Sequence, residues 1–162
     1  MDERIDIAGV IGALAVHVDA QRWSALALLF APAVRVDYSS LFGGEAQSLP
    51  REQLLAGWQQ LLPGFTHTCH VIGTPHITAS GITASSGTAR AEASVIATHW
   101  ISLPSLAGKD RWTVGGCYDF GFRKLEGSWR IDNLTLARAW QDGNPDLPRL
   151  ARERAAGSPS SA

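Results

Sequence analysis

The chain has few of the features that indicate a basic, disulfide-rich or metal-binding protein. Of its 162 residues, only Lys109 and Lys124 are lysines, and the formal net charge is -1. No basic surface is indicated, so neither nucleic acid nor an anionic membrane is expected as a partner. Cys69 and Cys117 stand alone, without CxxC spacing. Neither a disulfide framework nor a zinc site is therefore predicted.

The chain also lacks a long uninterrupted apolar run. The most apolar early stretch, residues 5–18, contains Asp6 and His17 and is too short to span a bilayer. The first residues are acidic, in contrast to the basic start of a secretory signal. A cytoplasmic protein is therefore expected. The chain length and an apolar share of 45% favour one domain with a substantial core.

Hydrophobic periodicity predicts an α+β order, with most helices before most strands. Apolar residues recur at helical spacing over residues 3–20, 22–30 and 50–62. Alternation with period two predicts strands over residues 34–38, 66–78, 88–103, 110–124 and 129–140.

Long antiparallel strands must curl in order to bury one face, and the helices would close the open side of the curl. We therefore expect a cone-shaped, mainly antiparallel (mixed) sheet that is wrapped around the N-terminal helices and encloses one apolar pocket. The domain is expected to span residues 1–142. Residues 143–162, rich in Pro, Gly, Ser, Ala and Arg, are predicted to form a partly disordered tail.

Several residues could give such a pocket acid–base character. Asp19 follows the first predicted helix, where it could also be a solvated turn residue or the N-cap of the next helix. His70 and His99 lie in predicted strands, and Tyr38 and Tyr118 each share a face with apolar neighbours. A carboxylate paired with an imidazole orients the ring, so that it can take or give a proton near neutral pH. The sequence by itself leaves open whether these residues converge.

Six short segments, in order along the chain, resemble the nuclear transport factor 2-like superfamily, and within it the SnoaL-like and scytalone dehydratase-like group. They are DAQRW (19–23), LFAP (29–32), VDY (36–38), TCHVIG (68–73), ATHW (97–100) and GSWRI (127–131). The resemblance covers about residues 5–140 and implies a single domain of the SnoaL-like, cystatin-like α+β barrel type.

The resemblance also implies roles for individual residues. Asp19 and His70 match the acid–base dyad of scytalone dehydratase and related dehydrochlorinases. His99 matches a second histidine there, and Tyr38 matches one of two water-holding tyrosines. The other tyrosine is replaced by Val18.

The positions that contact substrate in that family fall here on Gly116 and Tyr118, which differ from the serine and asparagine found there. Phe120 shares the apolar face of Tyr118, and Trp58 and Trp140 are candidates to cover the pocket. The likeness therefore implies proton-transfer chemistry with a different substrate.

The resulting hypothesis is a cofactor-independent dehydratase-like lyase or isomerase, without a metal, that acts on a small apolar hydroxy-carbonyl or polycyclic substrate through Asp19 and His70. A homodimer or homotrimer is expected. One alternative is a ketosteroid-isomerase-like enzyme or polyketide cyclase, with Asp37 as a candidate base. The other is a non-catalytic ligand-binding or assembly module, because fold alone does not decide function.

Overall fold

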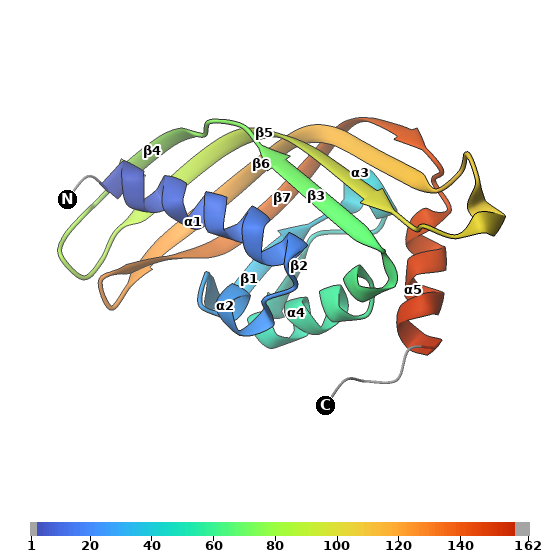
Figure 1. The fold of residues 1–162 in the computed structure, drawn as a ribbon. Coiled ribbons are helices and arrows are strands. Elements are labelled where there is room, and N and C mark those ends of the chain that lie inside the picture. Colours follow the sequence, from blue (N-terminus) through green and yellow to red (C-terminus); the bar gives the residue numbers. More distant parts are fainter. Residues whose placement is uncertain (1–2, 158–162) are drawn as a thin grey trace.

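The computed structural model describes residues 3–157, which form a curved, unclosed mixed sheet packed against N-terminal helices (Figure 1). The sheet has seven strands: β1 (Phe30–Asp37), β2 (Gln47–Pro50), β3 (His67–Ile72), β4 (His76–Ser80), β5 (Thr88–Trp100), β6 (Arg111–Leu125) and β7 (Ser128–Gly143). The helices are α1 (Glu3–Asp19), α2 (Trp23–Ala27), α3 (Ser39–Phe42), α4 (Arg51–Gln59) and α5 (Leu147–Gly157), with short 3-10 turns at η1 (Leu62–Gly64) and η2 (Pro104–Leu106).

The strand order is β2-β1-β7-β6-β5-β3. Strand β4 also pairs with β5, along residues 88–92, whereas β3 pairs with residues 95–100 of the same strand. Only the β1–β7 pair is parallel, and the other neighbours are antiparallel. The long strands β5, β6 and β7 arch over the helices, as Figure 1 shows. The predicted α+β class and curved sheet are confirmed.

Helix α1 packs its apolar side into the concave face of the sheet. Its buried residues are Ile7, Ile11, Leu14 and Val18, at the alternating spacing of four and three that a one-sided helix requires. On β5, alternate residues from Ala89 to His99 are buried, and four of them are alanines. Small side chains at these positions leave volume for the helix on the inner face of the sheet. Ala89, Ala91, Ala93 and Val95 belong to the hydrophobic core.

The predicted strand over residues 66–78 is two strands in the structure. β3 and β4 pair with different parts of β5, and the chain between them contains Gly73 and Pro75. Proline has no amide hydrogen to donate to a ladder, so the pairing is interrupted there. The chain then continues along the same partner strand.

Three short elements were not predicted: helix α3, strand β2 and the 3-10 turn η2. Elements of three or four residues are too short for hydrophobic periodicity to reveal. Two of them matter for the site, because α3 and β2 follow β1 and lie at the mouth of the cavity described below.

The prediction of a tail from residue 143 is wrong for residues 147–157, which form helix α5. Leu147 and Ala151 are fully buried, and α5 packs against η1 at one end of the molecule (Figure 1). The backbones of Gly64 and Ala151 approach so closely that a Cβ at Gly64 would overlap with Ala151. The remaining residues of the predicted tail, 158–162, lie outside the described part of the chain.

No helix within residues 3–157 combines the length and the apolar character needed to cross a membrane.

The contact between Gly64 and Ala151 yields a prediction about stability. Replacing Gly64→Ala should lower the free energy of unfolding by about 1–3 kcal/mol, because the added methyl group has no room beside the α5 backbone. Gly9→Ala is the control. It is exposed in α1 with open space around its Cβ, so the same methyl group should stabilise the protein by up to about 1 kcal/mol. Urea unfolding measures both, and equal effects would contradict this account of the α5 contact.

Candidate active site

A cavity of about 380 Å³ lies between the concave face of the sheet and the helices, a size typical of small-molecule sites. Its walls are mostly apolar, with Val36, Val95, Val114 and Leu134 on the sheet side. The polar exceptions on the sheet are few: His70 on β3, His99 on β5, Tyr118 on β6, Gln47 on β2, and Tyr38 directly after β1. The structure therefore brings together three of the four predicted catalytic side chains on the cavity wall, and the fourth, Asp19, lies behind His70.

The alternation of β3 directs His70 into the cavity. Burial alternates strictly along the strand, so Thr68, His70 and Ile72 face inward while His67 and Val71 face outward. His70 pairs across the strands with Ala97, whose small side chain leaves room beside the imidazole. His70 therefore shares the inward face of β3 with Thr68 and Ile72.

Asp19, the last residue of α1, is bound to β3 through three hydrogen bonds. Its Oδ1 accepts from the Thr68 hydroxyl at 2.8 Å and lies 2.7 Å from His70 Nδ1, and its Oδ2 accepts from the His70 backbone N–H at 2.8 Å. Because β3 is an edge strand that pairs only with β5, this amide would otherwise have no partner in the sheet. Asp19 therefore does not cap α2; it joins α1 to the sheet edge.

This environment keeps Asp19 ionised. Partial burial opposes the charge, but hydrogen bonds from the His70 side chain and backbone, together with Thr68, outweigh it and leave the pKa of Asp19 below its ordinary value. An ionised carboxylate only accepts hydrogen bonds, so His70 Nδ1 must carry the hydrogen that it shares with Asp19. In the neutral ring Nε2 is then the nitrogen with a free lone pair, as a general base requires.

His99 stands in a different environment from His70. Its ring packs against Phe65 and Trp112, with centroids 4.8 and 4.9 Å away, and meets the His70 ring edge-on at 5.4 Å. Burial, and then repulsion from a charged His70, lower the pKa of His99 to about 3. His99 is therefore a neutral imidazole at physiological pH. Its Nδ1 is buried and has no hydrogen-bond partner among the described residues.

Two tyrosines supply neutral hydroxyl groups. Burial and the proximity of Tyr118 raise the pKa of Tyr38 well above its ordinary value, and burial likewise raises the pKa of Tyr118. Both phenols therefore keep their hydrogens and can donate to a carbonyl oxygen or a water molecule.

Of the six predicted substrate-binding residues, Val18, Trp58 and Tyr118 line the cavity. Gly116, Phe120 and Trp140 do not, and their predicted contact with the cavity is wrong. Phe120 is fully buried between Tyr118 and Phe122, farther along the core. At Gly116, the backbone of Ala137 occupies the space that a side chain would take.

Trp140 is displaced by a β-bulge in β7. Gly116 pairs with Arg138 while Gly115 pairs with Trp140, so Ala139 is an extra residue in this ladder. The bulge reverses the alternation beyond it, and Trp140 packs over Gly115 on the outer face of the sheet, where it is 45% exposed.

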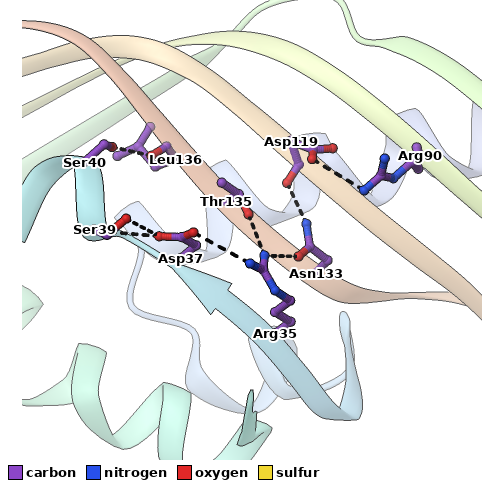
Figure 2. A network of polar contacts seen from close by, with 9 residues as sticks. All are labelled: Arg35, Asp37, Ser39, Ser40, Arg90, Asp119, Asn133, Thr135 and Leu136. Carbon is purple, nitrogen blue, oxygen red and sulfur yellow. Dashed lines mark hydrogen bonds and ion pairs between the residues drawn. The ribbon is translucent and has the colours of Figure 1, made fainter. Parts of the chain in front are cut away.

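Asp37, the alternative base, lies on the face of β1 opposite to Val36 and does not line the cavity. Its Oδ1 accepts from the backbone N–H and the hydroxyl of Ser39 at 3.0 and 2.6 Å, and its Oδ2 lies 3.8 Å from Arg35. These hydrogen bonds lower the pKa of Asp37. Figure 2 shows the carboxylate within a polar network that also fastens Arg35 to Asn133 and Thr135 on the adjacent β7.

Sequence reasoning missed the residues at the mouth of the cavity. Leu41 and Phe42 of α3 and Leu49 of β2 line it, and so does Arg152 of α5. None belongs to a motif, and α3 and β2 are too short to be recognised from periodicity. No three or more His, Cys, Asp or Glu side chains within residues 3–157 are grouped so as to hold a metal ion.

Comparison with known proteins identifies the family and the fold. A family model described as a SnoaL-like domain matches residues 1–135. No curated protein matches the chain. Among solved structures, the Kfla4162 protein of Kribbella flavida is 25% identical, with a TM-score of 0.77 over 90% of this chain and 96% of that one.

Two further structures share the fold at lower identity. A protein of Novosphingobium aromaticivorans, provisionally named scytalone dehydratase, is 20% identical, with a TM-score of 0.65 over 88% of this chain and 92% of that one. Hexachlorocyclohexane dehydrochlorinase LinA type 3 of Novosphingobium barchaimii is 13% identical, with a TM-score of 0.67 over 87% and 89%. At these identities the likeness shows the fold.

The hydrogen bonds of Asp19 lead to a prediction about acid stability. A carboxyl group whose pKa is lowered by folding stabilises the protein above the pKa of the unfolded chain, and this contribution is lost as the pH falls through the folded pKa. Asp19→Asn should therefore lower the free energy of unfolding by about 1–3 kcal/mol at neutral pH. The difference from wild type should shrink below about pH 4.

Urea unfolding at several pH values measures this difference. Asp146→Asn is the control, because Asp146 is an exposed carboxylate paired with Arg149, and it should change stability much less. A difference between wild type and Asp19→Asn that does not depend on pH would contradict the prediction.

Proposed function

The chain belongs to the SnoaL-like domain family, and we propose that it is a cofactor-independent acid–base lyase or isomerase. Its substrate would be a small, largely apolar hydroxy-carbonyl or polycyclic compound, in keeping with the mostly apolar cavity. The observation that carries the proposal is the 2.7 Å contact between Asp19 and His70 at the wall of this cavity.

His70 is the proposed base. Its Nδ1 donates to Asp19, so Nε2 is free to remove an acidic proton next to the substrate carbonyl. The electron pair of the broken C–H bond moves into the carbonyl as an enolate. Asp19 stabilises the imidazolium ion that results and fixes the ring orientation, because it also binds the backbone of the same residue.

Tyr38 and Tyr118 are the proposed donors to the enolate oxygen, directly or through a water molecule. Because the pKa of each phenol is raised, both keep their hydrogens at the pH at which His70 acts as base. Donors held in an apolar cavity interact strongly with developing negative charge, since little water competes with them.

Departure of the hydroxyl group completes an elimination. The enolate re-forms the carbonyl, the C–C double bond forms, and the C–O bond breaks. A proton must reach the leaving oxygen to give water, and the His70 imidazolium carries the one just removed. His99 would assist as a neutral hydrogen-bond partner, since its pKa of about 3 leaves almost no imidazolium to act as an acid.

If the proton returns instead to a different carbon atom, the same groups carry out double-bond isomerisation.

The expected homodimer or homotrimer remains part of the proposal. The outer face of the sheet supports it, because Val71, Ile96 and Trp140 are 60%, 48% and 45% exposed there. Val71 pairs with Ile96, Ile96 pairs with Gly115, and Gly115 pairs with Trp140, so the exposed apolar side chains form one row across four strands. Apolar rows of this kind are typical of interaction surfaces.

Replacing His70→Ala tests the function. With a panel of β-hydroxy ketones, whose dehydration gives enones that absorb in the ultraviolet, turnover should fall on the order of 100-fold or more without unfolding. His67→Ala is the control, because His67 lies on the exposed outer face of the same strand. Full turnover in a folded His70→Ala variant would refute the dyad. Saturable binding of a ligand that is recovered unaltered would instead indicate a non-catalytic binding module.

A second comparison distinguishes the two candidate carboxylates. Asp19→Asn should lower turnover strongly because His70 loses its charged partner, whereas Asp37→Asn should keep most of it because Asp37 faces away from the cavity. Turnover is measured with the same enone assay. The opposite ranking would identify Asp37 as the base and favour the ketosteroid-isomerase-like reading.

A further inference from the structure

The mouth of the cavity contains an arginine that no part of the proposed chemistry uses. Arg152 lies on α5 and lines the cavity, as do Gln53 and Gly57 of α4 and Leu61 just before η1. It lies beyond residues 1–135, the part matched by the family model, so the family likeness says nothing about it. We propose that Arg152 binds an anionic group, a carboxylate, on an otherwise apolar substrate whose reacting part lies at His70.

This inference rests on the proposed function, because it names the substrate class of the same cavity. Its first support is the fixed position of α5. Leu147 and Ala151 are fully buried, one helical turn apart, and the close approach of Ala151 to Gly64 fixes the helix against η1. Arg152 directly follows Ala151, so its backbone is held at the cavity although its side chain is exposed. A binding group on a fixed helix is placed more precisely than one on a loop.

The second support is a difference between two arginines on the same helix. Arg149 is neutralised by Asp146 at 2.9 Å and by Glu153 at 2.6 Å. Among the described residues, no carboxylate lies within ion-pair distance of Arg152. A guanidinium stays charged at any physiological pH and matches a carboxylate through two parallel hydrogen bonds. Of these two arginines, the one at the cavity is therefore the one left available for a ligand.

The third support is the distribution of polarity within the cavity. The walls around His70 and His99 are aromatic or aliphatic, whereas Gln47, Gln53 and Arg152 line it on β2, α4 and α5. A ligand with an apolar body and one polar end fits this division. Gly57 adds space on the same wall, since a Cβ there would meet no atom within 4 Å.

One carboxylate, Glu45, also lines the cavity, from the loop between α3 and β2. It is exposed and follows Gly43 and Gly44, both of which have positive φ angles of 74° and 83°. Because it stands on a loop, we give precedence to the arginine on the packed helix. If Glu45 were the binding group, the cavity would bind a cationic ligand more tightly than an anionic one, and the experiment below includes a cationic probe for this reason.

The test measures binding with three probes that share one ring system: 2-naphthoate, its uncharged analogue 2-naphthamide, and 2-naphthylmethylammonium. Calorimetry at about pH 8 keeps the carboxylate of naphthoate ionised. His70 and His99 are common to wild type and Arg152→Gln, so a difference between these two proteins reports on the arginine. Wild type should prefer naphthoate to naphthamide. Arg152→Gln should weaken naphthoate binding about tenfold and leave naphthamide binding unchanged.

Arg149→Gln is the matched control, because it removes the same charge from the same helix at a position already neutralised by two carboxylates. It should change neither affinity. Equal losses for naphthoate and naphthamide in Arg152→Gln, or no loss for either, would overturn the proposal. Tighter binding of the ammonium probe than of naphthoate by wild type would also overturn the proposal, and would identify Glu45 as the binding group at the mouth.

The two proposals can fail separately, because this experiment records binding and requires no turnover. Full activity in His70→Ala would refute the dyad while the preference for naphthoate stands. Absence of the preference in wild type, or its persistence in Arg152→Gln, would refute the role of Arg152 and leave the His70 result unaffected.

Discussion

The carboxylate of Asp19 is the point at which the helix layer, the sheet edge and the site meet. A negative charge at the C-terminal end of a helix is unfavourable, because the helix dipole places partial negative charge there. At Asp19 the adjacent strand compensates for this cost, with three donors from Thr68 and His70. The same bonds satisfy an edge amide of β3 and orient the imidazole. One group therefore fastens the end of α1 to the sheet edge and sets the tautomer of His70.

The cavity gives two histidines different properties by surrounding them differently. His70 lies next to a carboxylate, whereas His99 is enclosed by Phe65 and Trp112. The first ring has an anionic hydrogen-bond partner, whereas burial lowers the pKa of the second to about 3, although their centroids are only 5.4 Å apart. Such a separation of acid–base properties between similar groups is how one small site can provide both a base and a neutral hydrogen-bond partner.

Strand alternation made much of the site predictable, since period two fixed the inward face of His70 and His99. It could not show where along the inner face the cavity ends, and Phe120 lies beyond that end. It also failed beyond the bulge in β7, where one extra residue turns Trp140 outward. Helix α5 was not predicted because its segment is rich in Ala and Arg. The helix is held by a backbone contact between Ala151 and Gly64, which are 87 residues apart in the sequence. A contact of this kind leaves no periodic pattern in the sequence.

The placement of α5 divides the cavity between distant parts of the chain. The proposed acid–base residues come from α1, β3 and β5, which form the body of the domain, whereas the wall at the mouth is completed by a helix attached mainly through Leu147, Ala151 and Gly64. Substitutions on the cavity side of that helix can alter what is admitted without disturbing the contact between Asp19 and His70. Such an arrangement allows ligand preference to diverge between descendants of one ancestor while the Asp19–His70 pair is inherited unchanged.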